Sequence, residues 1–351
     1  MSKATKRETN AAVLKQAMIR RLPRRLSGSG EMSLPPAPAL LEHYVKLFDQ
    51  TWEGMGRKFT EPELAEFRTA LKARLEQAFE SSPTAKVVVS YSTDPPPKTS
   101  ITWKIVALGS SFADEYAHWV ATRTPPLFGK LPDAKALDMA RSLGAPAEVT
   151  VIDIGAGTGR NTLPLAREGF QVDAVEPAPA LCTVLREEVT TSGLPVNVVE
   201  GSILDEALVL PREQYRMVFL SEVIASHFRS VAQVRQLFEI AAQKLAPGGL
   251  LVFNAFLSDG GYKPDDLARQ LSQVMWCVVF TRHDLDVASK DLPFERLADE
   301  SAADYERAHL PEGNYPPTGW YDGWSGGQDL FDLPAQRPPM ELRWLVYRKM
   351  S

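Results

Sequence analysis

A glycine loop that follows a buried strand constrains the fold of this chain more than any other feature. Residues 149–162 read VTVIDIGAGTGRNT, an apolar strand followed by glycines at positions 155, 157 and 159, and we expect a helix to begin near Asn161. In an open α/β sheet such a loop lies at the carboxyl end of a strand, where the backbone can approach a ligand closely. The pattern predicts a ligand site at this edge of a parallel sheet.

Short apolar segments alternate with helix-like segments from Val149 onward. This alternation is typical of a parallel sheet that helices cover on both faces. The predicted strands are TVIDI, QVDAVE, VNVVE, RMVFLS, LLVFNA, MWCVVFTR and ELRWLVYR. We therefore predict an α/β fold class, with a Rossmann-like, doubly wound sheet of seven strands in residues 111–351.

The residues before this domain predict an extension at 36–110. Apolar residues recur every three or four positions across 38–82, which predicts two helices. KVVVSYS and TSITWKIVA predict a β-hairpin around TDPPPK, because proline cannot donate to a strand ladder. We expect this helical and β-hairpin extension to cap a pocket or to form a homodimer contact.

The first 35 residues are predicted to form a basic flexible tail. Residues 1–31 contain eight Lys and Arg against two Glu, and SGSGEMSLPPAPA has the composition of a flexible linker. A basic segment of this kind could touch an anionic membrane or guide import. We interpret it instead as a solvated terminal arm.

Charge and composition limit the classes of partner. The formal net charge is −5, and since residues 1–31 carry +6, the remaining residues carry −11. An acidic body repels nucleic-acid backbones, so we expect no nucleic-acid partner. The sequence has no run of about 20 apolar residues and no secretory signal, so we expect a cytoplasmic protein without a membrane partner.

Two details separate the glycine loop from a dinucleotide fingerprint. That fingerprint requires glycine at position 160, where this chain has Arg160. Asp153, two residues before the first glycine, would repel a pyrophosphate but would suit a cationic ligand. The loop resembles the first motif of class I S-adenosylmethionine-dependent methyltransferases, an acidic residue, one hydrophobic residue and then Gly-x-Gly-x-Gly. The resemblance implies S-adenosylmethionine as the cofactor and methyl transfer as the reaction.

The resemblance extends through the Rossmann-like part and implies a set of cofactor contacts. Residues implied to line the methionine half are Asp153, Gly155, Ala156 and Gly157. Glu176, which Pro177 follows in AVEP, is implied to bind the two ribose hydroxyls, because its two oxygens can accept from both at once. In EGSILD the family usually has an acidic residue where this chain has Ser202. Either Ser202 with Ile203 contacts the adenine, or Asp205 reaches back to it.

The fourth motif, YRMVFLSEVIASHF, implies further cofactor contacts from Ser221 and Glu222. Tyr116, in the helix ahead of the glycine loop, resembles in position the family residues that cover the methionine moiety. His227 follows the fourth strand closely enough to face the methyl group. A histidine that titrates near neutrality suits a general base, and a structural role is the alternative.

The segment PEGNYPPTGWYDGWSGGQDLF gathers aromatic residues just before the last predicted strand. It forms either a wall of the acceptor pocket or a satellite hydrophobic cluster. Aromatic faces suit a planar or a cationic acceptor. The substrate-binding candidates are Trp119, Trp320, Tyr321 and Trp324.

These observations predict a methyltransferase that acts on a small-molecule acceptor, such as a metabolite or natural product, with the acceptor atom left open. The main alternative is a protein or peptide methyltransferase whose extension docks the target; a non-catalytic binding module and a hydride-transfer enzyme are further alternatives. No acids or histidines cluster at ligand spacing, so we expect no metal. Cys182 and Cys277 lie in apolar runs and are expected to be free core thiols.

Overall fold

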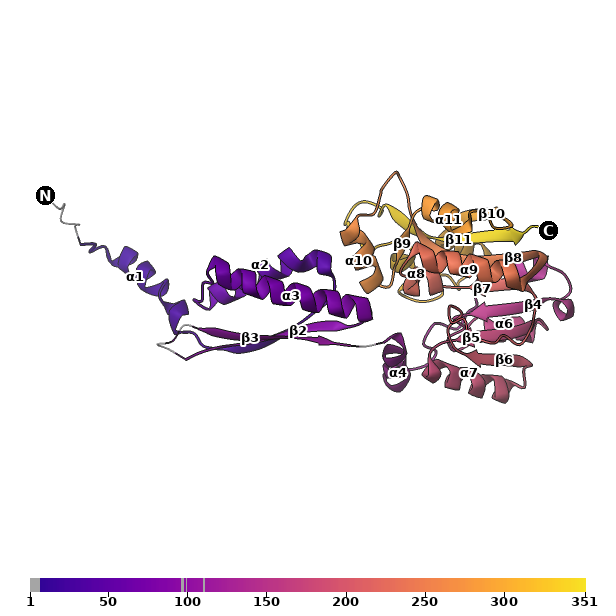
Figure 1. Ribbon diagram of the computed structural model, residues 1–351, viewed down its shortest axis with the longest axis horizontal. Helices are drawn as coiled ribbons and strands as arrows, with labels where there is room; N and C mark the ends of the chain where they lie inside the picture. The colour runs from indigo at the N-terminus through magenta and orange to yellow at the C-terminus, as the bar shows by residue number, and fades with distance from the viewer. Residues whose placement is uncertain (1–6, 96–97, 99, 110) are drawn as a thin grey trace. The chain divides into compact units, whose positions relative to one another are not determined.

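The computed structural model describes residues 7–95, 98, 100–109 and 111–351 (Figure 1). It divides into two compact units, unit 1 at Met1–Ser111 and unit 2 at Phe112–Ser351. Part of the predicted TDPPPK turn, Pro96 and Pro97, lies outside the described residues. In the part of the chain that is described, no helix combines the length and apolar character needed to cross a bilayer.

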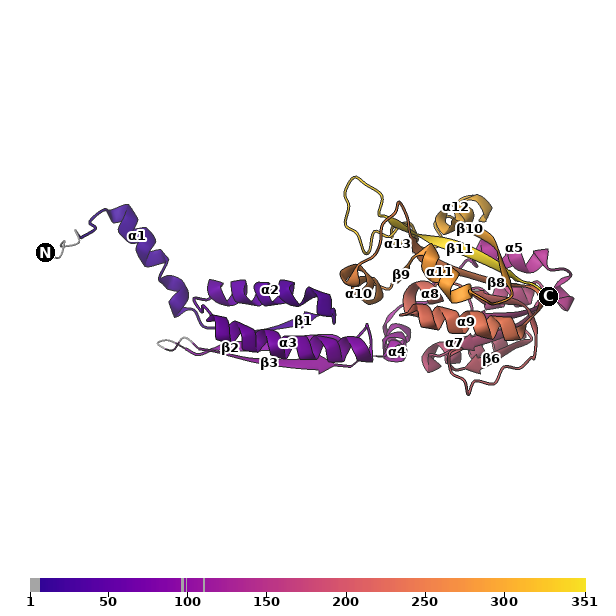
Figure 2. The same ribbon diagram turned by 45° about the horizontal axis from the view of Figure 1, so that its top comes forward.

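Unit 1 packs two helices on a three-stranded antiparallel sheet with the order β1-β2-β3. Figure 2 shows α2 and α3 on one face of this sheet. The strands are β1 (Ser29–Leu34), β2 (Lys86–Thr93) and β3 (Ile101–Leu108), and the helices are α1 (Ala11–Ile19), α2 (Leu41–Gly54) and α3 (Glu61–Ser81). The two helices at 38–82 and the hairpin are therefore present as predicted.

The core of unit 1 is aromatic. Trp52 of α2 is fully buried, stacks on Phe59 at a centroid distance of 4.5 Å, and meets Phe67 of α3 edge to face at 4.9 Å. Val87 and Val89 of β2 close this core from the sheet side, as the period-2 alternation of a half-buried strand requires. Helix α3 begins with a capping box between Thr60 and Glu63.

The prediction of a flexible linker is wrong for residues 29–34. This segment forms β1 and pairs with β2 in the register Ser29↔Ser92 to Leu34↔Val87. The backbone groups of the β2 edge bind it, and Leu34 is buried in the core. Side chains in β1 alternate between more exposed and more covered positions. The serine and glycine residues of SGEMSL do not show this alternation as a hydrophobic pattern, so the strand could not be predicted from the sequence.

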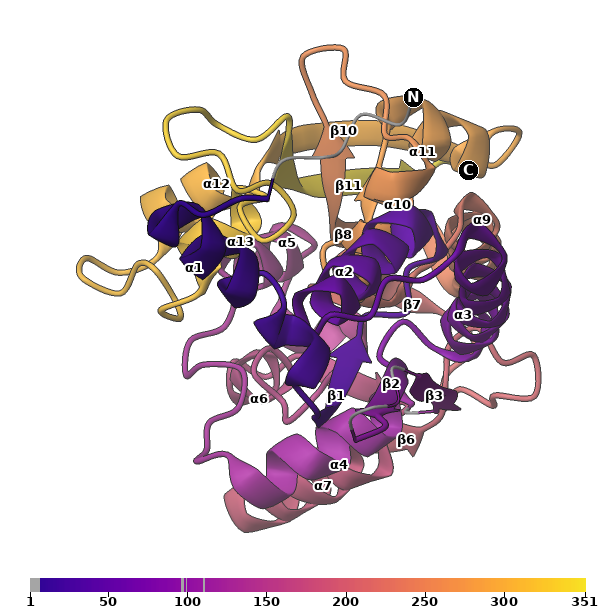
Figure 3. The ribbon, with the colours of Figure 1, turned by 90° about the vertical axis from the view of Figure 1, so that its left-hand side faces the viewer.

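Unit 2 contains the predicted Rossmann-like sheet, in the order β10-β11-β8-β7-β4-β5-β6, with β9 paired to β8 off this path. The strands are β4 (Thr150–Ile154), β5 (Gln171–Glu176), β6 (Val196–Glu200), β7 (Tyr215–Leu220), β8 (Leu245–Ser258), β9 (Val279–Phe280), β10 (Phe294–Ser301) and β11 (Met340–Lys349). Neighbours from β6 to β8 are parallel, and β11 is antiparallel to both β8 and β10. Figure 3 shows β10 and β11 side by side.

The sheet differs from the prediction at one edge. MWCVVFTR contributes only the two residues of β9, whereas the unpredicted β10 pairs with β11 along its length. Half of the residues of β10, FERLADES, are charged, because one side of this edge strand is solvated. Its Asp299 accepts from Arg282 at 2.7 Å and also pairs with Arg343. The sheet therefore has eight strands.

Unit 2 has helices on both faces of its sheet, together with helices that pack on other helices. They are α4 (Phe112–Thr122), α5 (Ala134–Ser142), α6 (Thr162–Arg167), α7 (Pro179–Ser192), α8 (Val223–His227), α9 (Val231–Lys244), α10 (Asp266–Val274), α11 (Arg282–Ser289), α12 (Ala302–His309) and α13 (Tyr321–Ser325). Val151 of β4 packs in the cluster that contains α5 and α6, and the adjacent Ile152 packs in the cluster that contains α9 and α11. The central strands are therefore apolar on both sides, as the sequence pattern predicted. Cys182 and Cys277 are free and buried, which confirms their prediction.

We predict that Trp52→Ala destabilises unit 1 by about 3–5 kcal/mol, because it removes a fully buried aromatic side chain and leaves a cavity. Hydrogen exchange of the α2 and α3 amides in the full chain, read by mass spectrometry, measures this change. Leu108→Ala, at a half-exposed position on β3, is the control and should change the free energy of opening by less than about 0.5 kcal/mol. Equal protection in both variants would contradict the assignment of the core.

Candidate functional site

The glycine loop joins β4 to α6 at the carboxyl edge of the sheet, and Asn161 directly precedes α6 as predicted. Gly155, Gly157 and Gly159 all have positive φ angles, of 71°, 56° and 95°. A Cβ atom on Gly155 would lie 2.3 Å from a methyl group of Val223, so this position accepts only glycine. The N–H groups of Gly155 and Ala156 donate to the carbonyl of Val175 on β5, which fixes the loop against the next strand.

Glu176 ends β5 beside this loop and is buried. One carboxylate oxygen accepts from the Gly157 N–H at 2.9 Å, and the other accepts from the Ala178 N–H at 2.8 Å. Burial raises the pKa of Glu176 to about 6. Each oxygen keeps a second lone pair, so the carboxylate can still accept from a ligand.

Asp153, on β4, lies under the same loop and is also buried. Its carboxylate accepts from the Thr162 hydroxyl at 2.6 Å, which ties the strand to the start of α6. Burial raises the pKa of Asp153 to about 6, and the hydrogen bond from Thr162 opposes this shift. The neighbouring charge of Asp153 in turn helps to raise the pKa of Glu176.

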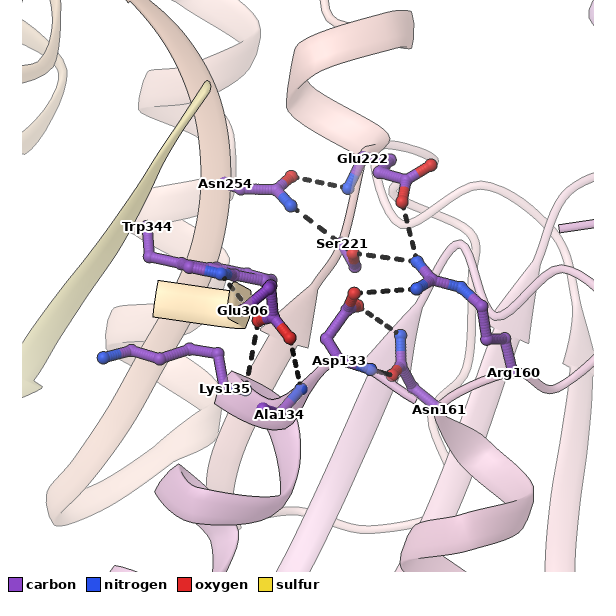
Figure 4. Close-up of polar contacts among 10 residues, drawn as sticks. All are labelled: Asp133, Ala134, Lys135, Arg160, Asn161, Ser221, Glu222, Asn254, Glu306 and Trp344. Atoms are coloured by element: carbon purple, nitrogen blue, oxygen red, sulfur yellow. Dashed lines mark hydrogen bonds and ion pairs between the residues drawn. The ribbon is translucent and has the colours of Figure 1, made fainter. Parts of the chain in front are cut away.

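Arg160 lies at the centre of a buried polar network (Figure 4). From the sequence, this residue served only to show that the loop is not a dinucleotide fingerprint. Its guanidinium donates to Asp133 at 2.7 Å and to Glu222 at 2.8 Å, and it also reaches the Ser221 hydroxyl at 3.3 Å. Asp133 accepts in addition from the Asn161 side chain at 2.9 Å. One cation is therefore shared between two carboxylates that come from opposite sides of the loop.

Asn254, which the sequence analysis missed, holds the end of β7 in place (Figure 4). Its side-chain oxygen accepts from the Glu222 N–H at 2.6 Å, and its amide lies 3.4 Å from the Ser221 hydroxyl. Glu222 has a φ of 64°, a conformation that is unfavourable for a residue with a side chain. The hydrogen bond from β8 supports this conformation and directs the Glu222 carboxylate toward Arg160.

The start of α5 is tied to α12 by Glu306 (Figure 4). Its buried carboxylate accepts from the Ala134 and Lys135 N–H groups at 2.7 and 3.3 Å, and from the Trp344 indole at 3.1 Å. Burial and the nearby charge of Asp133 raise the pKa of Glu306 to about 8. Asp133 directly precedes α5, so these contacts also position the partner of Arg160.

An aromatic cluster formed by α4, α8 and Trp276, two residues after α10, lies next to the glycine loop. The Tyr116 hydroxyl is 2.9 Å from Nε2 of His227, and the rings of Trp119 and Trp276 stack at 5.4 Å. Tyr116 also meets Phe128, whose ring would lie 3.3 Å from a Cβ atom on Gly157. The structure therefore brings Tyr116, Trp119 and His227 together near the loop, with Trp276 as a member that the sequence analysis had assigned to a strand.

The expectation that His227 titrates near neutrality is wrong. Burial lowers the pKa of His227 to about 4, so the imidazole is neutral at pH 7. Burial also raises the pKa of Tyr116 well above its usual range, with the charges of Glu176 and Glu222 adding to the shift. The pair is therefore neutral, and His227 is a weak base.

The aromatic insertion divides between the core and the surface. Tyr321 and Trp324 are buried, and Trp324 packs edge to face on Phe256 and donates from its indole to the Trp276 carbonyl at 3.0 Å. These two side chains belong to the hydrophobic core of one sheet face. Trp320 is 45% exposed and lines a different, open pocket of about 560 Å³ with the 126–131 loop.

The predicted adenine contacts lie after β6. Ser202 is exposed and its hydroxyl accepts from the Leu204 N–H at 3.2 Å, while Ile203 is buried. Asp205 is exposed and accepts from the Ala207 N–H at 3.0 Å within its own turn. Pro177, after Glu176, is exposed.

Known proteins are similar to the part of the chain that contains the glycine loop and Glu176. Residues 151–249 match the family described as "Methyltransferase domain". Ubiquinone biosynthesis O-methyltransferase of Methylobacterium sp. (strain 4-46) is 33% identical over 104 residues, which are 30% of this chain and 39% of that protein. Ribosomal RNA small subunit methyltransferase G of Mycobacterium leprae (strain TN) is 38% identical over 104 residues, 29% of this chain and 39% of that protein. The chain thus spans about two fifths of the length of these curated relatives.

Among solved structures, geranyl diphosphate C-methyltransferase from Streptomyces coelicolor A3(2) is similar with a TM-score of 0.47 and 14% identity, over 69% of this chain and 98% of that chain. The strand order of unit 2, the glycine loop after β4 and the carboxylate that ends β5 agree with the family match at residues 151–249. Residues 151–249, in the Rossmann-like sheet of unit 2, are therefore similar to the methyltransferase domain family.

Proposed function

We propose that this protein binds S-adenosylmethionine at the carboxyl ends of β4, β5 and β7 and transfers its methyl group to a small-molecule acceptor. One observation carries the proposal. Asp153 and Glu176 are buried at these strand ends, Glu222 is half-buried directly after β7, and Arg160, the cation at this edge, is shared between Glu222 and Asp133. Negative charge is therefore in excess, which favours a ligand that carries a sulfonium and an ammonium group.

The glycine loop would bind the methionine half of this ligand, because its glycines have no side chains that would keep a ligand away from the backbone. Glu176 would accept from the ribose hydroxyls through its remaining lone pairs, and Ser202, Ile203 and Pro177 would border the adenine. Ser221 and Glu222 would face the methionine end from β7. The cofactor supplies the methyl group and the leaving sulfide, and the protein supplies alignment.

The acceptor would lie beneath the aromatic cluster that contains Tyr116, Trp119 and Trp276. Since His227 is a weak base, the acceptor would arrive as a free nucleophile, such as a phenolate or a neutral amine, or would lose its proton to water. The Tyr116 and His227 pair would then orient the acceptor through hydrogen bonds. The acidic charge of unit 2, −11, disfavours an RNA acceptor, although one relative is named for ribosomal RNA.

We predict that Glu176→Gln weakens binding of S-adenosylmethionine by about tenfold to a hundredfold. The substitution replaces the charged hydrogen-bond acceptor of the ribose hydroxyls with a neutral one, and it removes a negative charge that attracts the cationic ligand. Isothermal titration calorimetry measures the affinity. The matched control is Glu200→Gln, since Glu200 is the neighbour of Glu176 in the register of β5 and β6 but is exposed and paired with Arg186. Unchanged binding by folded Glu176→Gln would reject the cofactor site.

Cofactor affinity should fall as the pH drops below about 6. The carboxyl groups of Asp153 and Glu176 have a raised pKa of about 6 in the free protein, so they are neutral below that pH and charged above it. A cationic ligand favours the charged form, and affinity at about pH 5 should decrease about tenfold for each carboxyl group whose pKa returns to its ordinary value in the complex. Calorimetry near pH 6 in buffers of different ionisation enthalpy should show proton release on binding. A pH-independent affinity would contradict this electrostatic account.

Methyl transfer itself can be tested with a panel of phenols, hydroquinones and amines. We expect acceptor-dependent formation of S-adenosylhomocysteine, detected by mass spectrometry. Tyr116→Phe should raise KM for the acceptor or lower kcat by about fivefold or more, since it removes a hydrogen bond near the reacting groups, while cofactor affinity stays close to that of the parent. Trp320→Ala is the control at the separate open pocket. Equal turnover with Tyr116→Phe would remove this residue from the acceptor site.

A further inference from the structure

The segment from α1 to Leu26 exposes a group of large apolar side chains to water. None of the residues of α1 is buried. Six large apolar side chains in this segment are 41–66% exposed, which is six of the sixteen such side chains in the described part of the chain. They are Val13, Leu14, Met18, Ile19, Leu22 and Leu26. Figures 1 and 2 show α1 projecting away from the sheet and helices of unit 1.

The end of this segment is attached to unit 1. The Arg57 guanidinium donates to the carbonyl of Leu26 at 3.2 Å and to that of Asp94 at 3.3 Å. Gly56, at a φ of 74°, lies directly against the backbone of Pro23 and Arg24. The segment is therefore attached to unit 1 at its carboxyl end, and α1 itself has no buried residue. The solvated arm predicted from the sequence thus leaves a large apolar surface in water.

Positive charge accompanies these apolar residues. Lys15 lies on α1, and four arginines follow within the next six residues after Ile19. They are Arg20, Arg21, Arg24 and Arg25, and no acidic residue lies between Asn10 and Gly30. Unit 2 has a net charge of −11. The net positive charge of the chain therefore lies in residues 1–31 of unit 1, and most of it comes from this segment.

We propose that residues 11–26 bind the surface of an anionic lipid bilayer. The apolar side chains would enter the boundary between headgroups and acyl chains, and the arginines would contact lipid phosphates. Both features are needed for stable binding at an interface, because a basic patch alone or a short apolar helix alone binds weakly. This inference replaces the expectation of no membrane partner and does not depend on the proposed methyl transfer.

The apolar side chains distinguish this partner from nucleic acid. Arginines bind phosphate backbones without help from exposed leucine, methionine and isoleucine, so RNA leaves the apolar surface unexplained. A second copy of the chain offers acidic charge, but the other exposed apolar side chains in the described residues come from many different elements, from Leu47 to Met350.

The test measures binding of the full chain to two kinds of vesicle, phosphatidylcholine alone and phosphatidylcholine with about 30% phosphatidylglycerol. We expect cosedimentation with the anionic vesicles and at least tenfold weaker binding to the neutral ones. Raising the salt concentration from about 0.1 M to about 0.5 M should weaken binding further, since salt screens the arginines. Equal binding to both vesicles, or to neither, would overturn the proposal.

Two double variants separate the two contributions. Leu14→Ser with Met18→Ser and Arg20→Gln with Arg24→Gln should each reduce binding to anionic vesicles by about tenfold or more. The matched control is Leu108→Ser with Val209→Ser, which removes exposed apolar side chains elsewhere and should bind like the parent. Thermal unfolding verifies that each variant is folded. If the Leu14 and Met18 variant binds like the parent, the apolar surface does not enter the bilayer and the proposal fails.

Two competing outcomes are measured in parallel. Tighter binding to poly(U) RNA than to anionic vesicles, lost in the arginine variant and kept in the Leu14 and Met18 variant, would assign the segment to RNA. Self-association that both double variants abolish in analytical ultracentrifugation would assign it to a second copy of the chain. Either result would overturn the bilayer proposal.

Discussion

The shared ion pair of Arg160 determines how the edge of the sheet is built. Its guanidinium binds Asp133 ahead of α5 and Glu222 after β7, so three separate segments are held around the glycine loop. Removing one partner from such a buried set leaves an uncompensated charge, which is strongly unfavourable. Asn254, on β8, binds the backbone of Glu222, and Glu306, on α12, binds the backbone next to Asp133. The position of the loop therefore depends on residues throughout unit 2.

This arrangement also explains why the strand ends suit a cationic ligand. Burial alone raises the pKa of a carboxyl group, and here Asp153 and Glu176 also affect one another. Their hydrogen bonds to Thr162 and to backbone N–H groups favour the charged form and oppose that shift. The pKa of each carboxyl group, about 6, therefore lies near neutral pH, so a positive ligand can complete the ionisation of both groups.

The sequence predicted the parts of this fold that depend on local pattern. The buried strands β4 and β7 have apolar residues on both faces, and the glycine loop needs positive φ angles that glycine provides. The charged edge strand β10 and the serine-containing β1 were missed, because their stability comes from pairing with β11 and β2. Arg160 was not recognised as a central residue, since its partners are 27 and 62 positions away. The low pKa of His227 also depends on burial, which no local pattern reveals.

The stacked pair of Trp119 and Trp276 has a kinetic consequence. The two indoles are in direct contact, tilted by 22°, so no third ring fits between them in this conformation. Trp276 also has a φ of 56°, a conformation that stores backbone strain. In the function proposed above, an acceptor bound beneath α4 would have to separate the two rings on its way in, and the product would have to separate them on its way out. The rate at which this aromatic gate opens would then limit turnover independently of the rate of the chemical step.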